Sequence, residues 1–280
     1  MLRRAVALAF VPALLGACTD APDDAVTSIP FGATDPTDPE ATATSLDASS
    51  SLDTTAASGP SPDDTSTTTT DDSTTGDPAC PPLPDPAPAW VTPLQQDLVA
   101  RLSGAAELSP GVTLSDRATP QSRAAALAYL QSTWESEGLA TTLHAYSDTG
   151  TNLYATLPAT LDTDLTVVIG AHYDTVPGSP GANDNATGVA MVTSLGRWLQ
   201  ELPCRELNVI LVLFDEEELG LLGSQAYASF LVAQPITVVS VHTIDQMGWD
   251  GDGDRALELE RADAGLFELY EAAEPLAPGA

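Results

Sequence analysis

The chain has 280 residues and a formal net charge of −31 at pH 7, because nine Lys and Arg residues face forty Asp and Glu. This acidity argues against a nucleic-acid-binding protein, which needs a basic surface, and against binding to anionic membrane surfaces. The three cysteines, Cys18, Cys80 and Cys204, are too few for a disulfide-rich scaffold.

The N-terminus has the pattern of an export signal. Arg3 and Arg4 precede an apolar stretch, residues 5–15, that is too short to span a bilayer as a helix. The Leu-Gly-Ala-Cys sequence that ends at Cys18 resembles the bacterial lipoprotein signal, in which the cysteine is acylated; an ordinary signal peptide is the alternative. We therefore expect residues 1–18 to direct export. The product would be an outer-membrane or cell-surface lipoprotein, held to the membrane by lipid only, or otherwise a periplasmic or secreted protein.

Residues 19–89 differ in composition from the rest of the chain. They are rich in Thr, Ser, Asp, Pro and Ala, with fourteen acidic residues and no basic ones. Such a segment cannot bury enough apolar surface to offset its chain entropy. We expect a disordered stalk, extended by its like charges, before a folded domain at residues 90–280. If Cys18 carries lipid, Cys80 and Cys204 remain and could pair in an oxidising compartment.

The folded domain is expected to begin with two helices. Apolar residues at helical spacing predict the first over residues 91–108. Thr119 and Pro120 are typical of an N-cap and a first-turn proline, and they predict a second helix that ends at Gly138.

Strands are expected from residue 139 onward. Two alternating segments, residues 139–146 and 151–157, predict a β-hairpin. Further strands are expected at residues 165–171, 207–214 and 236–244. A helix is expected to begin at Asp184 or Asn185 and to end before Pro203, with further helices at residues 219–232 and 264–273, and an acidic turn and short strand at residues 250–259. This alternation of strands and helices predicts an α/β fold with a largely parallel sheet.

Polar side chains follow three of these strands. His172, Asp174 and Asp184 follow the first, residues 215–218 (Asp-Glu-Glu-Glu) the second, and Asp245 the third. If these strands are parallel neighbours, the side chains converge at one edge of the sheet. So many carboxylates cannot all stay ionised without a cation. Imidazole and carboxylate ligands suit Zn²⁺, and a carboxylate-rich set suits two metal ions about 3.5–4 Å apart.

Four motifs carry a family resemblance. They are His-Tyr-Asp, Gly-Ala-Asn-Asp-Asn-Ala-Thr-Gly, Glu-Glu-Leu-Gly-Leu-Leu-Gly-Ser and Ile-Asp-Gln-Met-Gly, at residues 172–174, 181–188, 217–224 and 244–248. In this order they resemble the motifs of the secreted di-zinc aminopeptidases, a family that includes glutamate carboxypeptidases, glutaminyl cyclases and the non-catalytic ectodomain of the transferrin receptor. The resemblance covers residues 90–280. It implies a three-layer α/β/α fold with a mixed, largely parallel sheet.

The resemblance also implies a role for each motif residue. Four residues would be zinc ligands: His172, Asp184, Glu218 and Asp245. Asp184 would bridge the two ions, Glu217 would be the general base, and Asp174 would accept the other ring N–H of His172 and so fix its tautomer.

The implied activity is that of a metal-dependent exopeptidase acting on peptides, which activates water with two zinc ions. An acidic pocket suits a free α-ammonium group, which favours an aminopeptidase over a carboxypeptidase. Glu216 falls where the family usually has a small residue.

One departure from the family concerns the second zinc ion, which needs a further histidine after the fourth motif. His144 is expected to be structural or on the surface. His242 lies three residues before Asp245, so on a regular strand it points to the opposite face. We therefore expect the domain to be incomplete at its C-terminus. The alternative function is a metal-free or single-metal binding module of the same fold.

Simpler interpretations exist for several of these residues. Asp184 could be only a helix N-cap. Residues 216–218 could be the solvated acidic first turn of a helix, favoured by its dipole. Residues 250–254 (Asp-Gly-Asp-Gly-Asp) resemble the start of a calcium loop, but Arg255 stands where that loop needs glycine, so we expect a hairpin turn.

Overall fold

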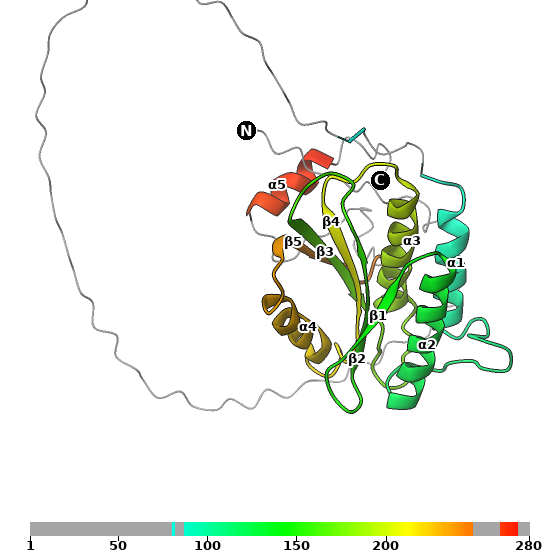
Figure 1. Cartoon of the computed structure of the whole chain (residues 1–280). Helices are drawn as coiled ribbons and strands as arrows, with labels where there is room; N and C mark the ends of the chain where they lie inside the picture. The colour runs from blue at the N-terminus through cyan, green and yellow to red at the C-terminus, as the bar shows by residue number, and fades with distance from the viewer. Residues whose placement is uncertain (1–79, 82–86, 249–263, 274–280) are drawn as a thin grey trace, which may run out of the picture. The chain divides into compact units, whose positions relative to one another are not determined.

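The computed structural model describes residues 80–81, 87–248 and 264–273 (Figure 1). The predicted signal peptide, nearly all of the predicted stalk, and the acidic turn and strand expected at residues 250–259 lie outside these residues. The described elements, in chain order, are α1 (Val91–Leu102), α2 (Pro120–Ser136), β1 (Thr141–Ala145), β2 (Thr151–Leu157), β3 (Leu165–His172), the helical turn η1 (Ala182–Thr187), α3 (Gly188–Glu201), β4 (Asn208–Phe214), α4 (Leu222–Val232), β5 (Thr237–Thr243) and α5 (Ala264–Ala273).

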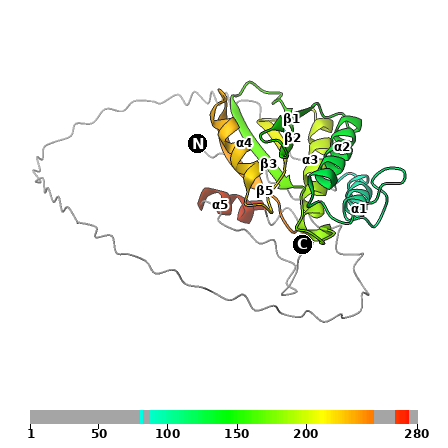
Figure 2. The same ribbon diagram turned by 90° about the horizontal axis from the view of Figure 1, so that it is seen from below.

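The five strands form one mixed sheet in the order β1-β2-β4-β3-β5. β3 pairs in parallel with both β4 and β5, whereas β2 is antiparallel to β4 and β1 is antiparallel to β2. The predicted hairpin and the three predicted parallel neighbours are therefore confirmed. Helices α1, α2 and α3 lie on one side of the sheet and α4 lies on the other, so the α/β/α fold class is also confirmed (Figures 1 and 2).

The main core lies between the sheet and the helices α1 to α3. β4 is buried on both faces, as its unbroken apolar sequence predicts. Leu98, Leu130 and Trp134, from α1 and α2, belong to this core and have no exposed surface. A smaller cluster on the other side of the sheet packs Phe214 against Tyr227 of α4.

Helix α1 is shorter than predicted, because it ends at Leu102 instead of residue 108. Gly104 follows with φ 78°, a left-handed conformation that suits glycine and ends helices. Helix α2 agrees with its prediction. Thr119 and Ser122 form a capping box, and Gly138 has φ 89°.

Two helices begin later than predicted, which corrects two interpretations. Helix α3 begins at Gly188. The Gly188 N–H donates to the side-chain oxygen of Asn185 at 2.9 Å, so Asp184 is not the residue that caps this helix. Helix α4 begins at Leu222, after Leu221 with φ 62°. The acidic residues 216–218 therefore lie in a turn before α4 and are not its first turn.

Strand β5 borders the described sheet, and several of its apolar side chains face solvent, such as Val241 with half of its surface exposed. The part of the chain that the structure describes contains no helix with the length and apolar character needed to cross a bilayer.

A disulfide joins Cys80 to Cys204, with 5.5 Å between the two Cα atoms, as the cysteine count allowed. The Cys80 N–H also donates to the Glu206 carboxylate at 2.7 Å. Cys80 lies within the segment predicted to be a stalk, and this bond ties it to the residues that follow α3.

Candidate metal centre

The candidate site is built where β3 and β4 end side by side. β3 ends at His172 and β4 ends at Phe214, and these two residues are register partners. The Tyr173 N–H donates to the Phe214 carbonyl at 2.9 Å, which continues the pairing one residue further. Because parallel strands end at the same edge, the motifs that follow them are brought together.

His172 lies at the centre of this cluster and is only 5% exposed. Its Nε2 atom is 3.1 Å from Asp184 Oδ1 and 3.6 Å from Asp245 Oδ1. Burial disfavours the imidazolium, but the carboxylates of Asp174 and Asp245 outweigh burial and raise the pKa of His172 to about 10. The ring therefore lies where a cation, either a proton or a metal ion, is favoured.

Asp174 connects two of the motifs. Its Oδ1 atom is 3.3 Å from His172 Nδ1, although the angle is not that of a hydrogen bond. The same carboxylate accepts the backbone N–H groups of Glu217 at 3.0 Å and Glu218 at 3.1 Å. The sequence predicted the proximity to His172 but not these two contacts, through which Asp174 also holds the acidic turn.

Glu217 and Glu218 face the same centre. A carboxylate oxygen from each lies within 4.8 Å of a His172 ring nitrogen, and the same limit holds among His172, Asp184 and Asp245. Burial raises the pKa of both glutamates; the charge of His172 opposes this rise, and the neighbouring carboxylates add to it. The structure thus gathers all four predicted ligands and the predicted base around one imidazole.

The loop that carries Asp184 is held against the segment that carries Asp245. Asp184 and Asn185 have non-helical backbone angles, and the peptide bond between them is cis. The Asn185 side chain donates to the Ile244 carbonyl at 2.8 Å, and the Gln246 side chain donates to Asp184 Oδ2 at 3.2 Å. These contacts place the fourth motif beside the second.

The two other histidines lie away from this cluster. His144 packs against Phe230, with 4.8 Å between ring centroids, and its Nδ1 atom is 3.2 Å from the Asn152 amide. His242 lies 2.8 Å from the Tyr270 hydroxyl. Among the described residues, the groups that could hold a metal ion include His172 but neither of these two histidines.

Sequence reasoning missed a buried arginine beneath the site. Arg117 has no exposed surface, and its guanidinium donates to four backbone carbonyls, those of Leu102, Tyr173, Pro180 and Gly181. Burial lowers the pKa of Arg117 to about 10, while nearby carboxylates oppose the change. Arg117 therefore holds the residues between the first and second motifs. The one available signal was the scarcity of basic residues in the chain.

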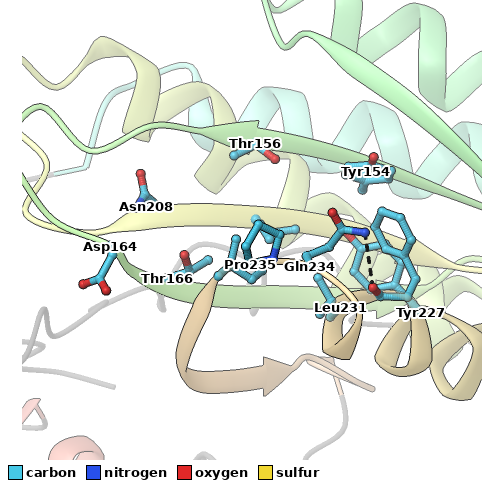
Figure 3. A pocket seen from close by; sticks show the side chains of 12 residues that line it. Tyr154, Thr156, Asp164, Thr166, Asn208, Tyr227, Leu231, Gln234 and Pro235 are labelled. Carbon is cyan, nitrogen blue, oxygen red and sulfur yellow. Dashed lines mark hydrogen bonds between the residues drawn. The ribbon is translucent and has the colours of Figure 1, made fainter.

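A cavity of about 420 Å³ lies away from this cluster, between α4 and the sheet (Figure 3). Tyr154, Thr166, Asn208 and Tyr227 line it, and none of the predicted site residues does. The candidate chemistry is thus at the carboxyl edge of the sheet and not in this cavity.

Comparisons with known proteins agree with the motifs. Residues 152–276 match Peptidase family M28. Aminopeptidase YwaD of Bacillus subtilis (strain 168) is 33% identical over 106 residues, which are 38% of this chain and 23% of that protein. Probable lipoprotein aminopeptidase LpqL of Mycobacterium tuberculosis (strain ATCC 25618 / H37Rv) is 33% identical over 101 residues, which are 34% of this chain and 20% of that protein.

Among solved structures, a leucine aminopeptidase precursor from Bacteroides thetaiotaomicron VPI-5482 gives a TM-score of 0.46 at 18% identity, covering 56% of this chain and 63% of that one. The chain spans less than a quarter of the length of each of these two curated relatives. The four motifs all lie within residues 152–276, the part of the chain that matches Peptidase family M28, so the family resemblance predicted from them is confirmed there.

Proposed function

We propose that this protein is a metallo-aminopeptidase that removes N-terminal residues from peptides with the help of bound zinc. The observation that carries the proposal is the convergence of one imidazole and four acidic residues, Asp184, Glu217, Glu218 and Asp245, at the carboxyl edge of the sheet. The aminopeptidases named among the relatives support the same activity.

The residues present fit a zinc ion. The donor set of one imidazole and several carboxylates is one that zinc accepts. Asp184 Oδ1 is buried without a hydrogen-bond partner among the described residues, although it lies 3.1 Å from His172 Nε2. A cation between Asp184 Oδ1 and His172 Nε2 would bind to both atoms. His172, Asp184 and Asp245 would hold one ion, and Asp184 and Glu218 would contribute to a second.

The proposed reaction assigns a task to each remaining residue. Bound zinc would lower the pKa of a water molecule and polarise the scissile carbonyl. Glu217, with its raised pKa, would take the proton from that water and return it to the leaving amine. Asp174 would keep the imidazole and the backbone of Glu217 in place.

The alternative is a binding module that holds one metal ion or none. It is favoured by the second site, for which the described residues supply carboxylates but no second imidazole. The two proposals differ in what Glu217 does. A binding module has no use for a general base, whereas the peptidase depends on it.

The decisive experiment compares wild-type protein with Glu217→Gln. We expect zinc to co-purify with both, measured by inductively coupled plasma mass spectrometry. Hydrolysis of leucine-p-nitroanilide should fall by about 10²- to 10⁴-fold in Glu217→Gln. Asp162→Asn is the matched control, because Asp162 is an exposed carboxylate in the loop before β3, at the far end of that strand. If the wild-type chain carries no zinc, or if Glu217→Gln hydrolyses the substrate at the wild-type rate, the peptidase proposal is wrong.

We also propose export as a lipoprotein, anchored through Cys18. The sequence pattern at residues 15–18 supports it, and one relative is named a lipoprotein aminopeptidase. In a bacterial host, labelled palmitate should be incorporated into wild-type protein and not into Cys18→Ser. Equal labelling of both proteins would contradict the anchor.

A further inference from the structure

The turn that carries Glu217 and Glu218 contains an unfavourable backbone conformation. β4 ends at Phe214, and two residues later Glu216 has φ 55°. A side chain with a Cβ atom rarely adopts this left-handed region, which costs free energy unless surrounding contacts enforce it. The contacts around Glu216 therefore decide whether the two following glutamates face the centre.

The Glu216 carboxylate is buried and is held by three donors from other elements. Its Oε1 atom accepts from the Arg123 guanidinium at 2.6 Å and from the Thr149 hydroxyl at 2.9 Å. Its Oε2 atom accepts from the Tyr146 hydroxyl at 3.2 Å. Arg123 belongs to α2, whereas Thr149 and Tyr146 belong to the β1–β2 hairpin. Two separate parts of the fold therefore donate hydrogen bonds to this side chain.

The preceding residue is held by the same arginine. Asp215 Oδ1 lies 2.8 Å from Arg123 Nε and accepts the Glu216 N–H at 3.0 Å. Asp215 Oδ2 accepts the Thr151 N–H at 3.1 Å. Arg123, Asp215 and Glu216 are all less than 5% exposed. Arg123 is thus the buried cation between two buried carboxylates, and its removal would leave both carboxylates without a compensating positive charge.

The turn is consequently fixed from two sides. Arg123 holds residues 215 and 216 from α2, and Asp174 holds the N–H groups of Glu217 and Glu218 from the β3 side. We propose that Arg123 is a positioning residue for the metal centre, which acts through Asp215 and Glu216 to keep Glu217 and Glu218 aimed at it. This inference rests on the proposed function, because it assumes that these glutamates serve a metal ion.

A purely structural role for Arg123 makes a different prediction. Loss of the ion pairs would then lower the free energy of unfolding and leave the metal geometry of the folded protein unchanged. Cobalt(II) separates the two roles, because its visible absorption depends on the number and arrangement of its ligands. The full chain is loaded with cobalt(II), its affinity is measured by competition with a chelator, and its unfolding is followed in urea.

Four variants make the comparison. In Arg123→Gln we expect cobalt(II) affinity to fall about tenfold or more, with a changed absorption spectrum. In Tyr146→Phe, which keeps the ring and removes one donor to Glu216, we expect affinity about threefold weaker.

Glu216→Gly added to Arg123→Gln should recover part of the lost cobalt(II) affinity, because glycine accepts the positive φ and one uncompensated carboxylate disappears. Arg197→Gln is the matched control: it breaks the ion pairs of Arg197 with Glu137, at the end of α2, and with Glu201 of α3, and should leave affinity and spectrum unchanged.

The outcomes separate the inference from the proposed function. If wild-type protein binds no cobalt(II), the proposed metal centre is wrong and the inference fails with it. If wild-type protein binds and folded Arg123→Gln has the wild-type affinity and spectrum, only the inference is wrong. If Arg123→Gln does not fold, Tyr146→Phe decides, and an unchanged affinity and spectrum there overturns the inference.

Discussion

The two faces of the sheet are packed very differently. On the side of α1, α2 and α3, large side chains such as Trp134 and Leu130 have no exposed surface. On the side of α4, Val232 is 88% exposed, and Val241 of the neighbouring β5 is 50% exposed. The candidate metal centre lies at the carboxyl edge of the sheet, where β3 and β4 end. His172 and Asp174 are 5% and 1% exposed, whereas the Asp245 side chain is 51% exposed and follows the exposed strand β5.

This difference indicates how the site is divided. The buried end of β3 would supply a rigid position for the imidazole, and Arg117 would hold the loop that follows it. The exposed strand β5 would supply a ligand, Asp245, whose position depends more on the bound ion, because fewer buried contacts restrain it. Four predictions test this contrast, in order of decreasing expected effect.

The largest effect is expected at Trp134. Its indole N–H donates to the Thr193 hydroxyl at 2.8 Å and joins α2 to α3. Trp134→Ala should lower the free energy of unfolding by about 3–5 kcal/mol, because it leaves a large cavity. The control Phe230→Ala, on half-buried α4, should cost clearly less. Urea denaturation measures both, and equal losses would show that the two faces are not different.

The second prediction concerns the metal ion. Zinc at one hundred times its dissociation constant should raise the free energy of unfolding by about 2.7 kcal/mol, because the ion binds only the folded state. Hydrogen exchange should slow more in β5 than in α3, since the ion would restrain the segment with fewer contacts. Zinc should not protect Asp184→Asn in this way. Equal protection of β5 and α3 would contradict the proposed division of the site.

The third prediction concerns pH and the α4 face. Burial lowers the pKa of His144 below its ordinary value of 6.5. The unfolded chain then binds this proton more tightly than the folded protein, so the contribution of His144 to stability is lost as pH falls below about 6.5. His144→Phe keeps an aromatic ring beside Phe230 and removes the titration. Its free energy of unfolding should change less than that of wild type between about pH 7.5 and 5.5, and an unchanged pH dependence would show that His144 does not contribute.

The smallest effect is expected at Val232. Its side chain is almost fully exposed at the end of α4. Val232→Ser should change the free energy of unfolding by no more than about 0.5 kcal/mol. A loss similar to that in Trp134→Ala, measured in the same urea series, would mean that Val232 is covered in solution.

Much of the fold was predictable because its signals are local. The apolar run of β4, the Thr119–Pro120 helix start and the helix end before Gly138 are each specified by a few neighbouring residues. The order of the four motifs also predicted which side chains would surround His172. Strand ends in a parallel sheet meet at one edge, so the position of each residue along its strand was enough.

The tertiary structure decided how these side chains are held. The sequence shows Arg117 as an ordinary arginine between two predicted helices and Arg123 as an ordinary arginine near the start of the second, and it gives Asp215 and Glu216 no role beyond an acidic segment. Only folding brings Arg123 to Asp215 and Glu216, and Arg117 to the carbonyls between the motifs. These contacts join residues far apart in the chain, and buried charges are tolerated only when such partners are present. The strand pattern and the motif resemblance therefore located the candidate ligands, whereas long-range pairing of buried charges fixed the turns that present them.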